Sequence, residues 1–79
     1  MNRPDIEKLR ILYNYNPQKL KLLETMYKNI AKENFPKILE INFDNTYSIH
    51  FLKKIANQLG YKFVRRKKEN RFFIIRKDD

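Results

Sequence analysis

The chain has 79 residues, of which 18 are lysine or arginine and nine are aspartate or glutamate, so its formal net charge is +9. It has no cysteine and one histidine, which excludes disulfides, thiolate metal sites, iron–sulfur clusters, cysteine nucleophiles and multi-histidine metal sites. We expect a cytoplasmic protein, because the sequence has neither a run of about 18 apolar residues nor an apolar signal core near its N-terminus.

The N-terminal segment predicts a strand followed by a helix. Residues 7–15 alternate between apolar and polar side chains, a period of two that is typical of a strand with one buried face. The apolar positions that define this period are Leu9, Ile11, Tyr13 and Tyr15. Asn16-Pro17 then predicts a helix start, because asparagine caps helix N-termini and proline is favoured in the first turn. The helix is expected to end near Glu33, before Phe35-Pro36.

The middle of the chain predicts a second strand and a second helix. Lys37 to Phe43 alternates again, and Asp44-Asn45-Thr46 has the chemistry of a turn. Thr46 to Leu59 carries an apolar stripe with helical spacing, and Asp44 is expected to cap this helix. Gly60, the only glycine, occupies the position where a helix-ending residue with positive φ belongs.

The C-terminal segment predicts a β-hairpin. Tyr61 to Lys67 and Arg71 to Lys77 are rich in strand-forming residues, and Lys68-Glu69-Asn70 connects them. Since this loop lacks glycine, Asn70 is the best candidate for a positive φ.

The predicted order is therefore β-α-β-α-β-β in one domain over residues 1–79, with its core at about 7–77. Right-handed crossovers would place both helices on one face of a four-stranded mixed sheet, an α/β (α+β) two-layer sandwich. The other sheet face would be open, with Leu12, Ile38 and Val64 among polar and basic side chains. Homo-oligomerisation through this open face is one expectation.

This order, over roughly residues 9–77, resembles the SirA/TusA-like sulfur-carrier family, whose members are domains of similar size. In that family a strand ends in a Cys-Pro-x-Pro motif that opens the first helix, and the equivalent stretch here is Asn16-Pro17-Gln18-Lys19. Residues 38–44, 49–64 and 71–77 are similar to the family's later strands and second helix.

The resemblance implies a fold without the family's activity. The family's cysteine carries sulfur as a persulfide, whereas this chain has Asn16 in that position, and an amide cannot accept a sulfane sulfur. We therefore expect neither sulfur transfer nor any other enzymatic activity, and no metal or cofactor. Asn16 is interpreted as a helix cap. Together with Gln18 and Lys19 it forms a candidate anion site at the helix N-terminus.

The strongest functional signal is the charge of the predicted hairpin, because residues 60–79 alone carry a net charge of +5. The candidate polyanion-binding residues are Lys53, Lys54, Arg65, Arg66, Lys67, Lys68 and Arg71. They suggest a binding or regulatory module whose partner is RNA, DNA or an acidic protein, and no membrane. The alternative is structural, because lysines on an edge hairpin also prevent edge-to-edge pairing.

A winged-helix DNA-binding protein is the second hypothesis. In it, His50, Lys53, Lys54 and Asn57 of the second helix would enter the major groove, and residues 61–77 would form a basic wing. The strand predicted at 37–43 counts against this hypothesis, because a winged-helix domain has a helix there.

Overall fold

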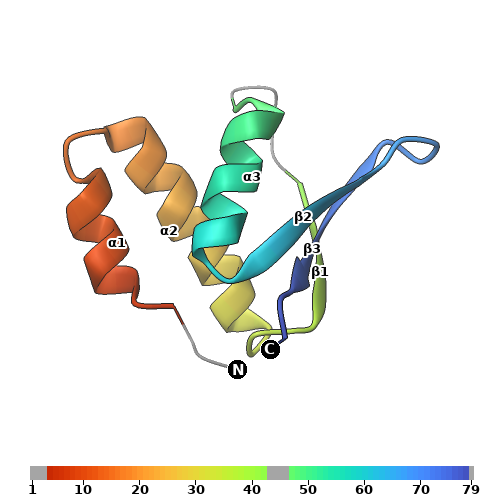
Figure 1. Ribbon diagram of the computed structural model, residues 1–79, viewed down its shortest axis with the longest axis horizontal. Helices are drawn as coiled ribbons and strands as arrows, with labels where there is room; N and C mark the ends of the chain where they lie inside the picture. Colours follow the sequence, from red (N-terminus) through yellow and green to blue (C-terminus); the bar gives the residue numbers. More distant parts are fainter. Residues whose placement is uncertain (1–3, 43–46, 79) are drawn as a thin grey trace.

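The computed structural model describes residues 4–42 and 47–78 (Figure 1). This part of the chain has an α+β fold of three helices and a three-stranded antiparallel sheet. The elements are α1 (Ile6–Tyr13), α2 (Pro17–Lys32), β1 (Ile38–Ile41), α3 (Ile49–Gln58), β2 (Tyr61–Arg66) and β3 (Arg71–Arg76). The helices lie on one side of the sheet, which makes two layers.

The first element is a helix, so the strand predicted at residues 7–15 is wrong. Asp5 caps α1 by accepting a hydrogen bond from the backbone N–H of Lys8 at 3.2 Å. Leu9 and Tyr13 are four residues apart, a spacing that places two side chains on one face of a strand and also on one face of a helix. The buried Tyr13 also donates a hydrogen bond from its hydroxyl to Gln58, which ties α1 to α3. The resemblance to the SirA/TusA-like family implied a strand here, and the structure departs from that expectation.

The predictions for α2 and for the end of α3 are confirmed. Asn16 caps α2, and its Oδ1 accepts a hydrogen bond from the backbone N–H of Lys19 at 3.1 Å. The predicted start of α3 is wrong, because the helix begins at Ile49 and the described residues Tyr47 and Ser48 precede it. Its cap is Ser48 and not the predicted Asp44, which lies, like Thr46, outside the described residues. Gly60 follows α3 with φ +83°, as its position predicts.

The sheet has the strand order β1-β3-β2, with both pairs antiparallel. The predicted fourth strand and the mixed sheet are therefore wrong for the described residues, because α1 replaces that strand. The second strand and the hairpin are confirmed within one or two residues at their ends. Asn70 has φ +51°, as predicted for the hairpin loop without glycine.

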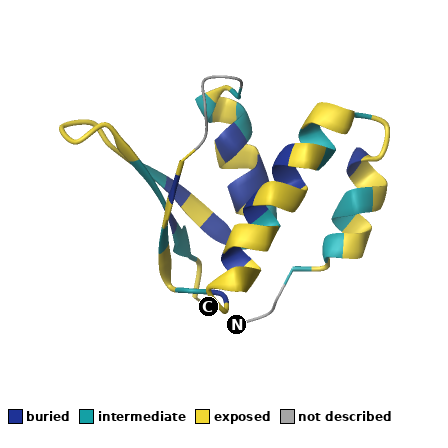
Figure 2. Cartoon of the chain, turned by 180° about the vertical axis from the view of Figure 1, so that it is seen from behind, coloured by how far each residue is buried: buried dark blue, intermediate teal, exposed yellow. Residues whose placement is uncertain are grey.

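The core lies between the helices and one face of the sheet. Register places Leu39, Phe63 and Ile74 side by side on this face, and they pack against buried residues of α2 and α3. The hydroxyl of the buried Tyr61 donates a hydrogen bond to the carbonyl of Pro36 at 2.6 Å, and burial raises the pKa of this phenol. Figure 2 shows buried segments where helices and sheet meet and exposed segments on the hairpin.

The opposite sheet face has no helix over it in the described part of the chain (Figure 1). Ile38 and Val64 lie on this face, as predicted, and Phe73 and Ile75 join them by strand alternation. Leu12, which was predicted there, lies instead on α1.

Candidate nucleic-acid interface

The positive charge is concentrated in one continuous segment of the fold. Residues 47–77, which form α3, β2 and β3, contain ten lysines or arginines and a single acidic residue, Glu69. With the two C-terminal aspartates included, residues 47–79 carry a net charge of +7, while residues 1–46 carry +2. A polyanion is therefore attracted more strongly to the C-terminal part of the molecule than to residues 1–46.

The exposed face of α3 is polar and basic. His50, Lys53, Lys54 and Asn57 are all exposed and are spaced three or four residues apart, so they share one face of the helix. The opposite face of α3 is buried in the core. The structure therefore brings together the four residues that the sequence suggested for contact with nucleic acid.

A shallow groove of about 280 Å³ joins α3 to the edge strand β2. Its lining includes Lys53 and Asn57 from α3, Lys62 from β2 and Lys77 from the end of the chain. The Lys77 ammonium donates a hydrogen bond to the Asn57 amide oxygen. Three lysines thus line one groove at the junction of helix and hairpin, and no acidic side chain lines it.

Lys62 and Lys77 did not stand out in the sequence as site residues. The turn at Gly60 between α3 and β2 brings Lys62 beside Lys53, whereas Lys77 reaches the groove through the pairing of β3 with β2. The sequence signal that could have identified them is the scarcity of acidic residues between positions 47 and 77, where Glu69 is the only one.

Two hairpin arginines are held over phenylalanine rings. The Arg65 guanidinium lies 5.5 Å from the centre of the Phe72 ring, and the Arg66 guanidinium lies 4.9 Å from the centre of the Phe73 ring. Because adjacent strand residues point to opposite faces, these guanidinium groups lie on opposite faces of the hairpin. Stacking orders each side chain and leaves its N–H groups available for hydrogen bonds to phosphate.

Lys67 and Lys68 are exposed in the loop between β2 and β3. Figures 1 and 2 both show this end of the hairpin extending away from the helices. The four consecutive basic residues 65–68 therefore lie on the part of the molecule that projects farthest from the core. We call residues 65–68 the hairpin tip.

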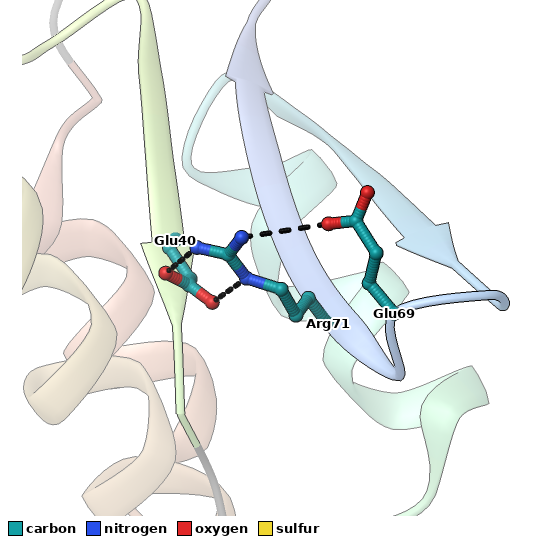
Figure 3. Close-up of polar contacts among 3 residues, drawn as sticks. All are labelled: Glu40, Glu69 and Arg71. Atoms are coloured by element: carbon teal, nitrogen blue, oxygen red, sulfur yellow. Dashed lines mark hydrogen bonds and ion pairs between the residues drawn. The ribbon is translucent and has the colours of Figure 1, made fainter.

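Arg71 is engaged in ion pairs, although the sequence suggested it for polyanion contact. Its Nε and Nη2 donate to the two carboxylate oxygens of Glu40 at 2.7 Å each, and its Nη1 lies 3.4 Å from Glu69 (Figure 3). The guanidinium lowers the pKa of Glu40, and the carboxylate raises the pKa of Arg71. This bidentate pair joins β1 to β3 and neutralises much of the positive charge of Arg71.

The candidate anion site at the start of α2 stands apart from the hairpin tip. In Figure 1, α3 lies between the start of α2 and the hairpin. Asn16 is occupied as a cap, Pro17 and Gln18 are exposed, and the Lys19 ammonium lies 5.2 Å from the centre of the Phe51 ring. Asn16 and Lys19 of the candidate anion site therefore both have contacts within the fold.

Residues 4–42 and 47–78 contain no cluster of side chains that could hold a metal ion. None of the helices in these two ranges is long and apolar enough to span a membrane. Comparison with known proteins found no matching family model, no matching curated protein and no matching solved structure. The basic residues of α3, β2 and β3 are the most distinctive feature of the described surface.

Proposed function

We propose that this chain is a double-stranded DNA-binding domain in which α3 enters the major groove and the β2–β3 hairpin contacts the phosphate backbone. The observation that carries the proposal is the concentration of ten lysines and arginines, against one carboxylate, in residues 47–77, which form α3, β2 and β3. Nucleic-acid affinity comes largely from the release of counterions by such a surface.

The dimensions of α3 suit the major groove. Like any α-helix, α3 is about 10–12 Å across with its side chains, and the major groove of B-DNA is about 12 Å wide. Lysine pairs with the acceptors of guanine and asparagine pairs with adenine, so Lys53, Lys54 and Asn57 can contact base edges. The groove with Lys62 and Lys77 lies beside this face and can receive a backbone phosphate.

The hairpin supports the same binding mode. Arg65 and Arg66 are ordered on opposite faces of the hairpin by their contacts with Phe72 and Phe73. A projecting hairpin with cations on both faces can follow a phosphate backbone from within a groove. Helix, groove and hairpin tip together supply the basic residues of the proposed interface.

This proposal develops the winged-helix hypothesis without requiring a helix-turn-helix. Strand β1 separates α2 from α3, so the binding unit consists of α3, Gly60 and the following hairpin. Membership of the SirA/TusA-like family and the lack of enzymatic activity stay predictions.

The test is a fluorescence anisotropy titration with a labelled 20-base-pair duplex across a series of salt concentrations. We expect binding at about 50 mM salt that weakens steeply as salt rises. The hairpin variant, in which residues 65–68 are all changed to glutamine, should reduce the slope of log K against log salt by about 3 to 4 units.

A matched control removes four charges from residues 1–46, outside the proposed interface. Lys21, Lys28, Lys32 and Lys37 are all exposed, and changing them to glutamine should leave the slope nearly unchanged. The proposal is wrong if duplex binding is absent at low salt, or if both variants lose affinity equally. Stronger binding to single-stranded DNA, to RNA or to an acidic protein would also contradict it.

A further inference from the structure

The exposed face of α3 presents many hydrogen-bond donors and few acceptors. Its exposed residues are His50, Lys53, Lys54 and Asn57. The two lysines can only donate, and the helix contains neither aspartate nor glutamate. His50 accepts only through the unprotonated nitrogen of a neutral imidazole. The amide oxygen of Asn57 is therefore the main acceptor that this face could offer to a base.

That oxygen is already used within the fold. The Lys77 ammonium donates a hydrogen bond to it, and because an ammonium can only donate, the oxygen and not the N–H₂ group of Asn57 faces Lys77. The backbone supports this contact, since the N–H of Lys77 donates to the carbonyl of Gly60 at 2.9 Å and so lies beside the C-terminal end of α3. Gln58, the other side-chain amide at this end of α3, likewise accepts through its oxygen from the Tyr13 hydroxyl. Asn57 therefore keeps its N–H₂ donors for a ligand.

The bases differ in what they present to such a face in the major groove. Guanine presents two acceptors, adenine one acceptor and one donor, cytosine a donor, and thymine an acceptor and a methyl group. The bidentate contact of asparagine with adenine needs the amide oxygen as well as the N–H₂ group, and Lys77 holds the oxygen of Asn57. The exposed residues of α3 are all polar, so none of them favours the thymine methyl group. A face made of donors matches guanine best.

We infer that α3 prefers guanine, so that a duplex with consecutive guanines binds more tightly than an A·T duplex of the same length. Lys53 and Lys54 donate to the N7 and O6 atoms of guanine, and the Asn57 N–H₂ group donates to a neighbouring acceptor. Lys77 is a positioning residue, because it takes the Asn57 oxygen that adenine would need. This inference rests on the proposed DNA binding and names the class of site that is bound.

The first experiment compares three duplexes of equal length in the anisotropy titration at one salt concentration. One has a central run of guanines, the second has 7-deazaguanine at the same positions, and the third has A·T pairs there. Their phosphate charges are equal, so the difference in affinity reports on the bases. Since 7-deazaguanine pairs with cytosine but lacks the N7 acceptor, the second duplex separates base contacts from duplex shape. We expect the guanine duplex to bind at least about fivefold more tightly than either of the others.

The second experiment tests the role of Lys77. Lys77→Ala frees the Asn57 oxygen for adenine and should reduce the preference for the guanine duplex over the A·T duplex at least about twofold. The matched control is Lys62→Ala, which removes one charge from the same groove and leaves the contact between Asn57 and Lys77 in place. It should weaken binding to both duplexes by the same factor and leave the preference unchanged.

The outcomes separate this inference from the function on which it rests. Equal affinity for the three duplexes would overturn the guanine preference and leave the proposed DNA binding intact. A preference that Lys62→Ala reduces as much as Lys77→Ala would overturn the positioning role of Lys77. Absence of binding to every duplex at low salt would overturn the proposed function and this inference with it.

Discussion

Arg71 shows how a single contact changes the role of a charged residue. By position it belongs to the basic hairpin, and its side chain lies on the same sheet face as Arg66. The bidentate contact with Glu40 nevertheless holds its guanidinium against β1 (Figure 3). A guanidinium that already satisfies a carboxylate has fewer donors left for phosphate. We therefore expect Arg71 to contribute less to the proposed DNA binding than Arg65 or Arg66.

Glu40→Gln should accordingly increase affinity for duplex DNA. The change removes a negative charge beside the hairpin and releases the Arg71 guanidinium from its strongest partner. We expect several-fold tighter binding and a salt slope that steepens by about one unit, measured by the anisotropy titration described above. The matched control is Glu24→Gln, because Glu24 also pairs with an arginine but lies on α2, outside the proposed interface. Equal or weaker binding by Glu40→Gln would show that the ion pair with Glu40 does not limit the contact of Arg71 with DNA.

At the same scale, several local predictions are confirmed because their causes are local. Asn16 caps α2 with its own side chain, and Gly60 and Asn70 take the positive φ values that the chain reversals require. Each of these outcomes depends on a residue's intrinsic conformational preferences and on neighbours within a few positions. No distant contact is needed to predict them.

Among the elements, α1 shows where a sequence pattern is insufficient. Residues 7–15 alternate well enough to predict a strand, yet a strand also requires a neighbouring strand to satisfy its backbone hydrogen bonds. A helix satisfies those bonds within itself, and α1 gains burial of Tyr13 and the hydrogen bond to Gln58 as well. The alternation remains visible as apolar residues on both sides of the helix.

The attachment of β1 to β3 should weaken in acid. The Glu40–Arg71 pair lies across these two strands, and the folded state lowers the pKa of Glu40 below its ordinary value of 4.5. A carboxyl group with a lowered folded-state pKa stabilises the fold above its unfolded pKa, and that contribution is lost as pH falls through the folded pKa.

Urea unfolding measures this contribution as the difference in stability between wild type and Glu40→Gln. We expect wild type to be more stable than Glu40→Gln at neutral pH, and the difference to shrink as pH falls below 4.5. Other carboxyl groups, such as Asp78 beside Arg76, are common to both proteins and cancel in the comparison. A difference that stays constant down to pH 3 would contradict the role given to this pair.

For the whole molecule, the separation of charge has a cost in stability. Ten cations and one carboxylate within residues 47–77 repel one another in the folded state. We expect the Tm to rise as salt increases from about 0.05 to 0.5 M, and screening of about 1 kcal/mol would raise it by roughly 4–8 °C. Differential scanning calorimetry at fixed protein concentration measures this shift.

The hairpin variant is the sharpest comparison for this effect, because it removes four of the ten cations at the exposed tip. Its Tm should start higher at low salt and respond less to added salt. A Tm of the wild-type protein that falls or stays constant with salt would show that the repulsion is relieved in some other way.

The sequence by itself determined the positions of α2, β1 and the β-hairpin, the end of α3, the cap of α2, the positive φ of Gly60 and Asn70, and the basic character of the hairpin. These features follow from periodicity, from capping and turn preferences, and from charge, which act over a few residues. Only the tertiary structure decided that residues 6–13 form a helix and that the sheet has three antiparallel strands in its described part. It also placed Lys53, Lys62 and Lys77 around one groove and paired Arg71 with Glu40. These outcomes depend on which strands pair and which surfaces are buried together, and such long-range contacts leave no local pattern in the chain.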